Sequence, residues 1–453
     1  MAKASGSTYQ DEYLQIIRDL DGDRAGRSVA NEHLFDVYER RAGSIDWATN
    51  PYVIDGTQYD ALDKAATTMV KIMEKVMFKY HRDRSFRSLF SLDPKVEELT
   101  LVPSGFRSAV PLMRLDIFFD PATCDFKIGG IVTGGMGGMA ANAGVTRALY
   151  NTESFHRFKR KHPGLETTDA LRECINTILY TYSQWTNAEE GRNHPTHPSL
   201  AIVDIEGSVR AGETRLAIDV LRELGVYARA SHFSQLRIET IGGIRQLVDN
   251  HGPITCVWLR ATADEAAAHP CEGLDALVKA TRRGMVCTIG GYRSWPCCTR
   301  SFVEMLRSKD CRALLTKEEN DFIAEHLPEV HLINASSDLS DFYDQDRWVI
   351  KTTDGPVHGN VLAGNSMSKQ EWRTRLVKSI KRHDAVQDCI AHPTMLVAHA
   401  DDQGNPVETT KDVILRLYVF GGALKGIAAG CGTGATVPGW NDYLEMACVI
   451  VRD

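Results

Sequence analysis

Between residues 62 and 77, apolar side chains recur at steps of three and four residues. Such steps give a helix one apolar face, so this stretch predicts a helix that packs against a core. Its methionines could also line a ligand groove, but thioethers commonly fill irregular gaps in cores, which favours packing. We expect the first 98 residues to be a helical region. The apolar series is Leu62, Ala65, Met69, Ile72, Met73, Val76 and Met77.

A β pattern begins after residue 99. Residues 112–119 alternate in part, Pro121-Ala122 has turn composition, and residues 126–132 are again apolar. The two runs predict a β-hairpin. Arg114 and Asp116 are two positions apart, so their side chains share one face of the first strand.

The next block alternates between helical and β patterns. An amphipathic helix is expected at 165–187, a strand at 200–205, a helix at 213–224, and further strands at 255–259 and 284–289. This order predicts a parallel α/β domain. Loops at the carboxyl ends of parallel strands usually carry ligands, so Glu206, Arg210 and Arg260 are candidate substrate contacts.

A third pattern starts at residue 347. Trp348, Val349 and Ile350 predict a strand that places Lys351 beside a loop, 352–364, with three glycines. A cation beside mobile backbone amides suits a polyphosphate, although the spacing differs from a P-loop. Strands are also expected at 385–390 and at 414–420, the latter followed by a Gly421-Gly422 turn.

Composition narrows the class of protein. The chain has 453 residues, 43% of them hydrophobic and 25% charged, which is ordinary for a globular protein of two or three domains. A formal net charge of −7 argues against a general nucleic-acid binder, which needs clustered cations. The first residues do not resemble a signal peptide, and no run reaches membrane-spanning length, so we expect a cytoplasmic protein. Eleven scattered cysteines are expected to be reduced.

Taken in order, these segments resemble the glutathionylspermidine synthase-like family of circularly permuted (type 2) ATP-grasp ligases. The resemblance covers roughly residues 99–453 and includes Tyr292-Arg293-Ser294, similar to a Phe-Arg-Ser turn, and Leu315-Thr316-Lys317-Glu318-Glu319, a helix start with a capping box. It implies that Arg114 stabilises an acyl-phosphate oxyanion and that Asp116 helps to hold Mg2+. Arg293 joins the candidate substrate contacts. The ATP contacts that it implies are Lys351, Asp354, Gly355, Gly359, Gln387 and Asp388.

The sequence departs from that family on the second hairpin strand. Gly130, Val132 and Gly134 stand where the family has glutamate, asparagine and aspartate, and Mg2+ needs carboxylates as well as substrate phosphates. The family's arginine near Cys431 is also missing; Arg416 either replaces it or pairs with a surface acid. Gly135-x-Gly137-x-x-Ala140 weakly matches a dinucleotide fingerprint, whereas close backbone packing is the simpler interpretation.

The sequence therefore predicts α/β and α+β architecture: an ATP-grasp fold with a central parallel α/β (pre-ATP-grasp) domain and an N-terminal helical segment. Expected boundaries are 1–98, 99–198, 199–312 and 313–453. One functional hypothesis is an ATP-dependent carboxylate-amine ligase that uses ATP, Mg2+ and small-molecule substrates. The other is a catalytically degenerate homologue that acts as a binding or partner subunit. The oligomeric state and the identity of the substrates are left open.

Overall fold

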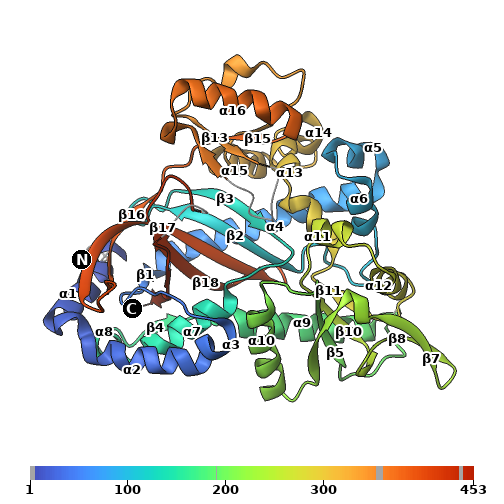
Figure 1. Ribbon diagram of the computed structural model, residues 1–453, viewed down its shortest axis with the longest axis horizontal. Coiled ribbons are helices and arrows are strands. Elements are labelled where there is room, and N and C mark those ends of the chain that lie inside the picture. Colours follow the sequence, from blue (N-terminus) through green and yellow to red (C-terminus); the bar gives the residue numbers. More distant parts are fainter. Residues whose placement is uncertain (1–5, 190, 353–360, 438–441, 453) are drawn as a thin grey trace.

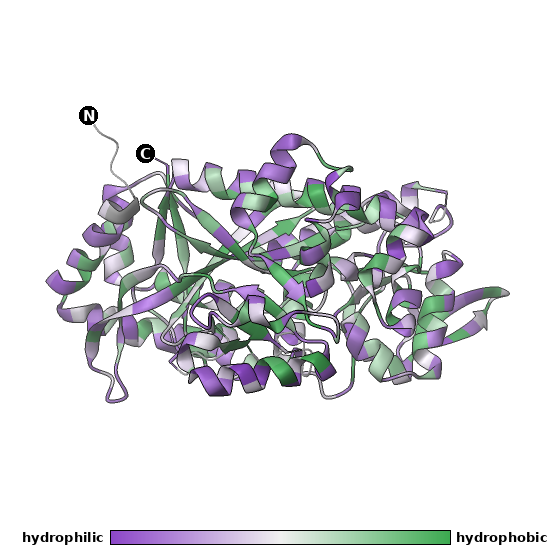
Figure 2. Ribbon diagram, turned by 90° about the horizontal axis from the view of Figure 1, so that it is seen from above, coloured by the Kyte–Doolittle hydropathy of each residue, from purple (hydrophilic) through white to green (hydrophobic). Residues whose placement is uncertain are grey.

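The computed structural model describes residues 6–189, 191–352, 361–437 and 442–452. A large antiparallel sheet lies at the centre (Figure 1), with a smaller lobe above it, an α/β block at one end and the N-terminal helices at the other. Both chain ends lie beside that second end of the sheet. Hydrophobic residues concentrate on the strands inside the molecule, and hydrophilic residues on the outer helices (Figure 2).

The central sheet joins segments that are far apart in the sequence. Its main order is β19-β18-β17-β2-β3, with β16 also pairing β17, and all its pairs are antiparallel. The predicted hairpin is confirmed as β2 and β3, and Gly421-Gly422 forms the turn between β17 and β18. The bounds are β2 (Leu112–Phe119), β3 (Phe126–Val132), β16 (Thr394–Ala400), β17 (Pro406–Phe420), β18 (Ala423–Gly432) and β19 (Leu444–Met446).

One face of this sheet packs against α4 (Gly56–Arg82), which contains the predicted amphipathic helix. Asp55 caps the helix with a capping box to Gln58, which satisfies free N–H groups of the first turn. Met69, Met73 and Met77 are fully buried, so the methionine stripe is core. The chain then forms α5 (Arg84–Arg87), η3 (Ser88–Phe90) and α6 (Pro94–Thr100).

The N-terminal region contains a strand as well as helices. Strand β1 (Tyr52–Asp55) runs parallel to β20 (Cys448–Val451), which also pairs with β4 (Leu165–Thr167). The helix expected from residue 165 therefore starts later, as α9 (Ala170–Asn187), because residues 165–167 pair with β20. The helices of this end are α1 (Gly6–Asp19), η1 (Asp21–Asp23), α2 (Arg24–Leu34), η2 (Phe35–Glu39), α3 (Arg40–Ala42), α7 (Met139–Leu149) and α8 (Glu153–Lys161).

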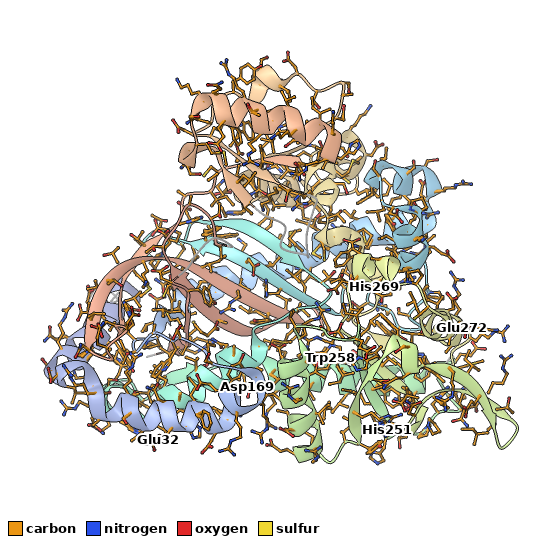
Figure 3. All side chains as sticks on the ribbon, in the orientation of Figure 1. Glu32, Asp169, His251, Trp258, His269 and Glu272 are labelled. Carbon is orange, nitrogen blue, oxygen red and sulfur yellow. The ribbon has the colours of Figure 1, made fainter. Side chains whose placement is uncertain are left out.

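The predicted parallel α/β unit is present, with strand order β11-β10-β5-β6 and parallel pairing throughout. Trp258 lies inside this block (Figure 3). A small antiparallel sheet extends from it. The bounds are β5 (Leu200–Asp204), α10 (Ala211–Glu223), β6 (Ala228–His232), η4 (Phe233–Gln235), β7 (Arg237–Ile241), β8 (Ile244–Asp249), β9 (Gly252–Ile254), β10 (Cys256–Leu259), α11 (Ala263–Ala268), α12 (Glu272–Arg282) and β11 (Cys287–Ile289).

The smaller lobe is an antiparallel sheet in the order β12-β15-β13-β14. The predicted capping box is present in α15: the Glu319 N–H donates to Thr316 Oγ1, and the Thr316 N–H donates to Glu319 Oε2. No described helix is both long and apolar enough to cross a membrane. The bounds are η5 (Tyr292–Cys298), α13 (Arg300–Met305), α14 (Lys309–Arg312), α15 (Lys317–His326), β12 (Val330–Leu332), η6 (Leu339–Phe342), β13 (Trp348–Lys351), β14 (Val361–Ala363), η7 (Gly364–Ser366), α16 (Lys369–Arg382) and β15 (Ala385–Asp388).

Candidate functional site

The hairpin holds Arg114 and Asp116 on the face of the central sheet that is turned away from α4. In register, Arg114 lies opposite Val132 and Asp116 opposite Gly130. The Arg114 Nε lies 2.8 Å from Asp116 Oδ1, and its Nη2 donates to Oδ2 at 2.9 Å. Arg114 is only 8% exposed, so the two charges form a partly buried pair that contacts both carboxylate oxygens.

Lys351 reaches this hairpin from the smaller lobe. It ends β13, and its Nζ donates to the Gly129 carbonyl of β3 at 3.1 Å. Burial, and then the charge of Arg300, lower the pKa of the Lys351 ammonium to about 8, while the charge of Asp116 opposes the shift. The structure thus brings Lys351 to the hairpin strand that pairs with β2, within electrostatic reach of Asp116, the partner of Arg114.

Arg300 is a residue that the sequence analysis missed. It is the first residue of α13, directly after the N-cap Thr299, and its charge acts on Lys351. Burial lowers the pKa of the Arg300 guanidinium, and its buried Nε has no hydrogen-bond partner within the described residues. Its signal in the sequence is an arginine directly behind a capping threonine, seven residues after Arg293.

Arg416 lies across from Asp116 in the β17–β2 register. Its Nη2 donates to Glu445 and to the Ala429 carbonyl. The expectation of a surface acid as its partner is wrong, because the Glu445 side chain is 2% exposed. Tyr443 donates from its hydroxyl to the other Glu445 oxygen at 2.8 Å. A second arginine-carboxylate pair therefore stands beside the first on the same sheet face.

The glycine-rich segment 133–138 forms the edge of this face. The Gly137 carbonyl accepts from Arg114 at 3.2 Å and from the Tyr418 hydroxyl at 3.0 Å. The Gly138 N–H donates to Glu213 Oε2 at 2.9 Å. A dinucleotide fold needs the chain to return after the helix as a strand parallel to the first one in the same sheet. Here the chain passes through α7 and α8 into β4, which pairs with β20 in a different sheet from β3. Close packing explains this segment.

Two of the predicted substrate contacts are held by internal carboxylates. Arg210 pairs with Asp204 and Glu265, each at 2.7 Å. Arg260 donates to the Met136 carbonyl at 2.6 Å and pairs with Glu213, and its guanidinium lies 4.9 Å from the Trp258 ring centroid. Arg260 is also 1% exposed. Arg260 thus supports the glycine-rich segment through the Met136 carbonyl, and the role of both arginines toward a substrate stays a prediction.

The other predicted positions are spread out. Glu206 is exposed in the loop after β5. Gln387 is buried on β15 between Val330 and Val349. Asp388 accepts from the Glu329 N–H and pairs with Arg347. Asp354, Gly355 and Gly359 lie outside the described residues.

Asp388 also borders a recess of about 400 Å3 where the chain passes from the smaller lobe to the central sheet. Lys127 of β3, Arg307, Glu329 and residues 389–391 line it as well. This recess lies between the sheet of the smaller lobe and the central sheet, and its volume is large enough for a planar ring. The prediction that Gln387 and Asp388 border adenine remains untested.

The donor set suits an anion better than a cation. The cations near the hairpin face are Lys351, Arg300, Arg114 and Arg416, and the carboxylates there are Asp116 and Glu445. The buried Nε atoms of Arg300 and Arg416 have no hydrogen-bond partner among the described residues. Phosphates can accept from such donors. Mg2+ does not fit these residues, because both Asp116 oxygens face Arg114 and no group of three or more potential metal ligands occurs in the described chain.

Comparisons with known proteins bear on the fold. A glutathione synthetase-like effector from Globodera pallida, solved in its apo form, aligns with a TM-score of 0.60 at 10% identity, over 95% of this chain and 97% of that one. The chain is therefore similar in fold to that glutathione synthetase-like protein. A protein described as a gamma-glutamylcysteine synthetase from Methylobacillus flagellatus aligns with a TM-score of only 0.39, at 10% identity over 84% of this chain and 88% of that one. No protein-family model and no curated protein sequence matches.

Proposed function

We propose that this protein is an ATP-dependent carboxylate-amine ligase. The observation that supports the proposal is the convergence of Lys351, Arg300 and the Arg114–Asp116 pair between the smaller lobe and the hairpin. Phosphoryl transfer depends chiefly on positioned cations around spreading negative charge. In a ligase-like fold, an anion site at this place is consistent with the binding of a nucleoside triphosphate.

In the proposed reaction a substrate carboxylate oxygen attacks the γ-phosphorus of ATP, and the bond to the β-phosphate oxygen breaks, which releases ADP. An amine then attacks the acyl phosphate, loses a proton and expels inorganic phosphate, leaving an amide. Lys351 and Arg300 would hold the phosphates. Arg114 would donate to the oxygen that becomes negative at the acyl carbon, which is where a charged donor lowers the barrier most.

The finer parts of the proposal follow from the sequence resemblance. We infer a circularly permuted, glutathionylspermidine synthase-like arrangement in which residues 313–453 carry the nucleotide site, together with cytoplasmic location and small-molecule acid and amine substrates. In support, the central sheet combines β2 and β3 with strands from the end of the chain. Gln387 and Asp388 would border the adenine.

A second candidate is a nucleotide-binding protein without ligase activity. The pairing of Asp116 with Arg114, and of Glu445 with Arg416, favours it, because both carboxylates are already neutralised. Loss of one transition-state donor commonly costs about 10² to 10³ in turnover. A site that lacks a metal-binding carboxylate would therefore bind the nucleotide and turn over slowly or not at all.

The deciding experiment measures both properties on the same preparation. Calorimetric titration with ATP tests binding, and ADP release is followed with ATP, Mg2+ and mixed amino acids or polyamines. Lys351→Met should weaken ATP binding by about tenfold to a hundredfold, the effect of losing a charged hydrogen bond. Lys425→Met is the matched control, since Lys425 is half exposed and pairs with Glu173.

Binding together with ADP release that depends on an acid and an amine supports the ligase. Binding without release supports the second candidate. If ATP does not bind to the unmodified protein, or if both lysine variants behave alike, the proposed nucleotide site is wrong.

A further inference from the structure

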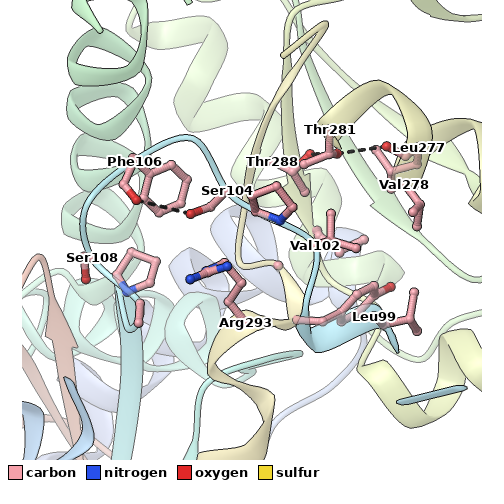
Figure 4. Close-up of a pocket in the computed structure, with 16 residues that line it drawn as sticks. Leu99, Val102, Ser104, Phe106, Ser108, Leu277, Val278, Thr281, Thr288 and Arg293 are labelled. Carbon is pink, nitrogen blue, oxygen red and sulfur yellow. Dashed lines mark hydrogen bonds between the residues drawn. The ribbon is translucent and has the colours of Figure 1, made fainter. Parts of the chain in front are cut away.

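An apolar slot separates the segment before β2 from the α/β block. Leu99, Val102 and Phe106 line one side, and Leu277 and Val278 of α12 line the other (Figure 4). Its cavity volume is about 40 Å3, room for a small branched aliphatic group, since one water needs about 10–15 Å3 on the same measure. The slot continues into an open recess of about 740 Å3.

Arg293 lines both the slot and the recess. Figure 4 shows its guanidinium under the arch of chain that carries Ser104 and Phe106. Within the described residues the guanidinium has no hydrogen bond and no ion pair. An arginine is always charged in proteins, so this half-buried guanidinium, which has no ion pair within the described residues, can pair with an anion.

Within the described residues, no group around Arg293 pairs directly with its guanidinium. The carboxylate of Glu74 acts on it from a distance, but Glu74 already accepts from the Ser108 hydroxyl at 2.6 Å and from the N–H groups of Ala109 and Val110 at 3.1 and 3.0 Å. Burial, and then the charge of Arg293, lower the pKa of His81 to about 3, so His81 is neutral. Arg82 adds positive charge.

The serine and threonine hydroxyl groups that line the slot are already paired, whereas the buried hydroxyl of Tyr292, which also lines it, has no hydrogen-bond partner among the described residues. Thr281 and Thr288 share a hydrogen bond of 2.8 Å, Thr281 also donates to the Leu277 carbonyl at 2.9 Å, and Ser104 donates to the Phe106 carbonyl at 3.3 Å. These bonds are drawn as dashed lines in Figure 4. The slot therefore offers apolar walls, the Arg293 cation without an ion pair and the Tyr292 hydroxyl, a combination that suits an acid with an aliphatic chain.

We propose that the slot binds a small aliphatic carboxylate, with its carboxyl group on Arg293 and its hydrocarbon chain between α12 and the 99–109 segment. The site adjoins the hairpin, because the carbonyl of Ser294, the residue after Arg293, accepts from the Thr133 hydroxyl at 3.0 Å, and Val132, the residue before Thr133, lies opposite Arg114. The inference that this slot holds the acid that the ligase activates rests on the proposed ligase function. The inference that it binds an aliphatic carboxylate does not depend on that function.

The test titrates the full-length protein, without nucleotide, with acetate, 4-methylpentanoate and 4-methylpentanamide. The long acid should bind at least about tenfold more tightly than acetate, since each buried methylene contributes roughly fourfold. It should also bind about tenfold more tightly than the amide, which lacks the charge for Arg293.

Two variants locate the ligand. Arg293→Gln should reduce the affinity for 4-methylpentanoate to that of the amide and leave the affinity for the amide unchanged. Val278→Trp, at a half-exposed position on the slot wall, should reduce the affinity for the long acid to that of acetate. Arg107→Gln is the control, because Arg107 is exposed on the recess rim; a change of less than about twofold is expected there. Thermal melting verifies that each variant folds.

Equal affinity for acid and amide would overturn the proposal, as would equal losses in Arg293→Gln and Arg107→Gln, or no binding of 4-methylpentanoate at millimolar concentration. These results are distinct from failure of the proposed function. A protein that binds the acid but ignores ATP contradicts the ligase alone, and one that binds ATP but no acid contradicts this site alone.

Discussion

At the residue scale, Lys351 has an unusual environment for a lysine. Its described hydrogen bond goes to a neutral carbonyl, and the charges that shift its pKa most are Arg300, which lowers it, and Asp116, which raises it. Burial of an ammonium group without enough nearby negative charge disfavours its charged form and lowers its pKa. The pKa of about 8 places the loss of this proton just above neutral pH.

The first prediction follows from that pKa. Bound phosphates stabilise the charged ammonium, so ATP binding near pH 8 should take up a fraction of a proton, and affinity should fall by up to about tenfold per pH unit above pH 8. Below about pH 7 the lysine is already protonated and no uptake is expected. Calorimetry in buffers of different ionisation heat measures the uptake. It should vanish in Lys351→Met, and a buffer-independent heat at pH 8 in the unmodified protein would contradict the prediction.

The second prediction concerns magnesium. Because Asp116 is paired on both oxygens, removal of Mg2+ by EDTA should change the Kd for ATP by less than about threefold. Asp116→Asn should remove a negative charge beside the proposed phosphate site and tighten ATP binding about twofold to tenfold. Titrations with and without EDTA measure both. A large Mg2+ dependence that disappears in Asp116→Asn would instead show that Asp116 binds the metal.

At the scale of single elements, patterns with local causes were predicted well. The bounds 112–119 and 126–132 match β2 and β3, since alternation and a turn are local signals. The α9 start was wrong because residues 165–167 form a strand only through a partner from the chain end. Arg300, Glu445 and Tyr418 were missed for a related reason: each is part of the site only through the positions of other elements.

The third prediction tests helix packing with two glycines near helix starts. A Cβ on Gly273 in α12 would lie 1.7 Å from the Phe233 carbonyl oxygen, whereas a Cβ on Gly56 in α4 meets nothing within 4 Å. Gly273→Ala should lower the free energy of unfolding by about 1–3 kcal/mol through overpacking. Gly56→Ala should be neutral or stabilise by up to about 1 kcal/mol. Urea unfolding measures both, and equal effects would show that the η4–α12 contact is looser than described.

At the scale of the whole molecule, the two ends of the chain are joined through β20. This strand lies between β1 and β4, and its residues are at most 3% exposed. The domain boundaries predicted at 98, 198 and 312 remain predictions, yet pairing of β1 with β20 connects the first predicted segment to the last. Single-sequence patterns cannot reveal which distant strands pair, because every apolar strand offers similar hydrogen bonds and similar side chains.

The fourth prediction is that β20 is required for folding. A chain that ends at Met446 should lose its cooperative thermal transition, because β1 and β4 would lose their shared partner and a buried apolar strand. Arg452→Ala is the control, since its ion pair with Glu166 is exposed, and it should shift Tm by no more than about 2 °C. Circular dichroism follows both. A truncated chain that melts cooperatively near the temperature of the intact protein would contradict the prediction.

Gly130, opposite Asp116, limits how this site could be re-engineered. An added Cβ at residue 130 would already lie 3.1 Å from Asp116 Oδ2, so grafting a glutamate there would crowd two acids against Arg114. A designer who adds an acid at residue 130 would therefore have to let the Asp116 carboxylate move aside by a few tenths of an ångström, and the backbone opposite Asp116 would have to keep its register while it did so.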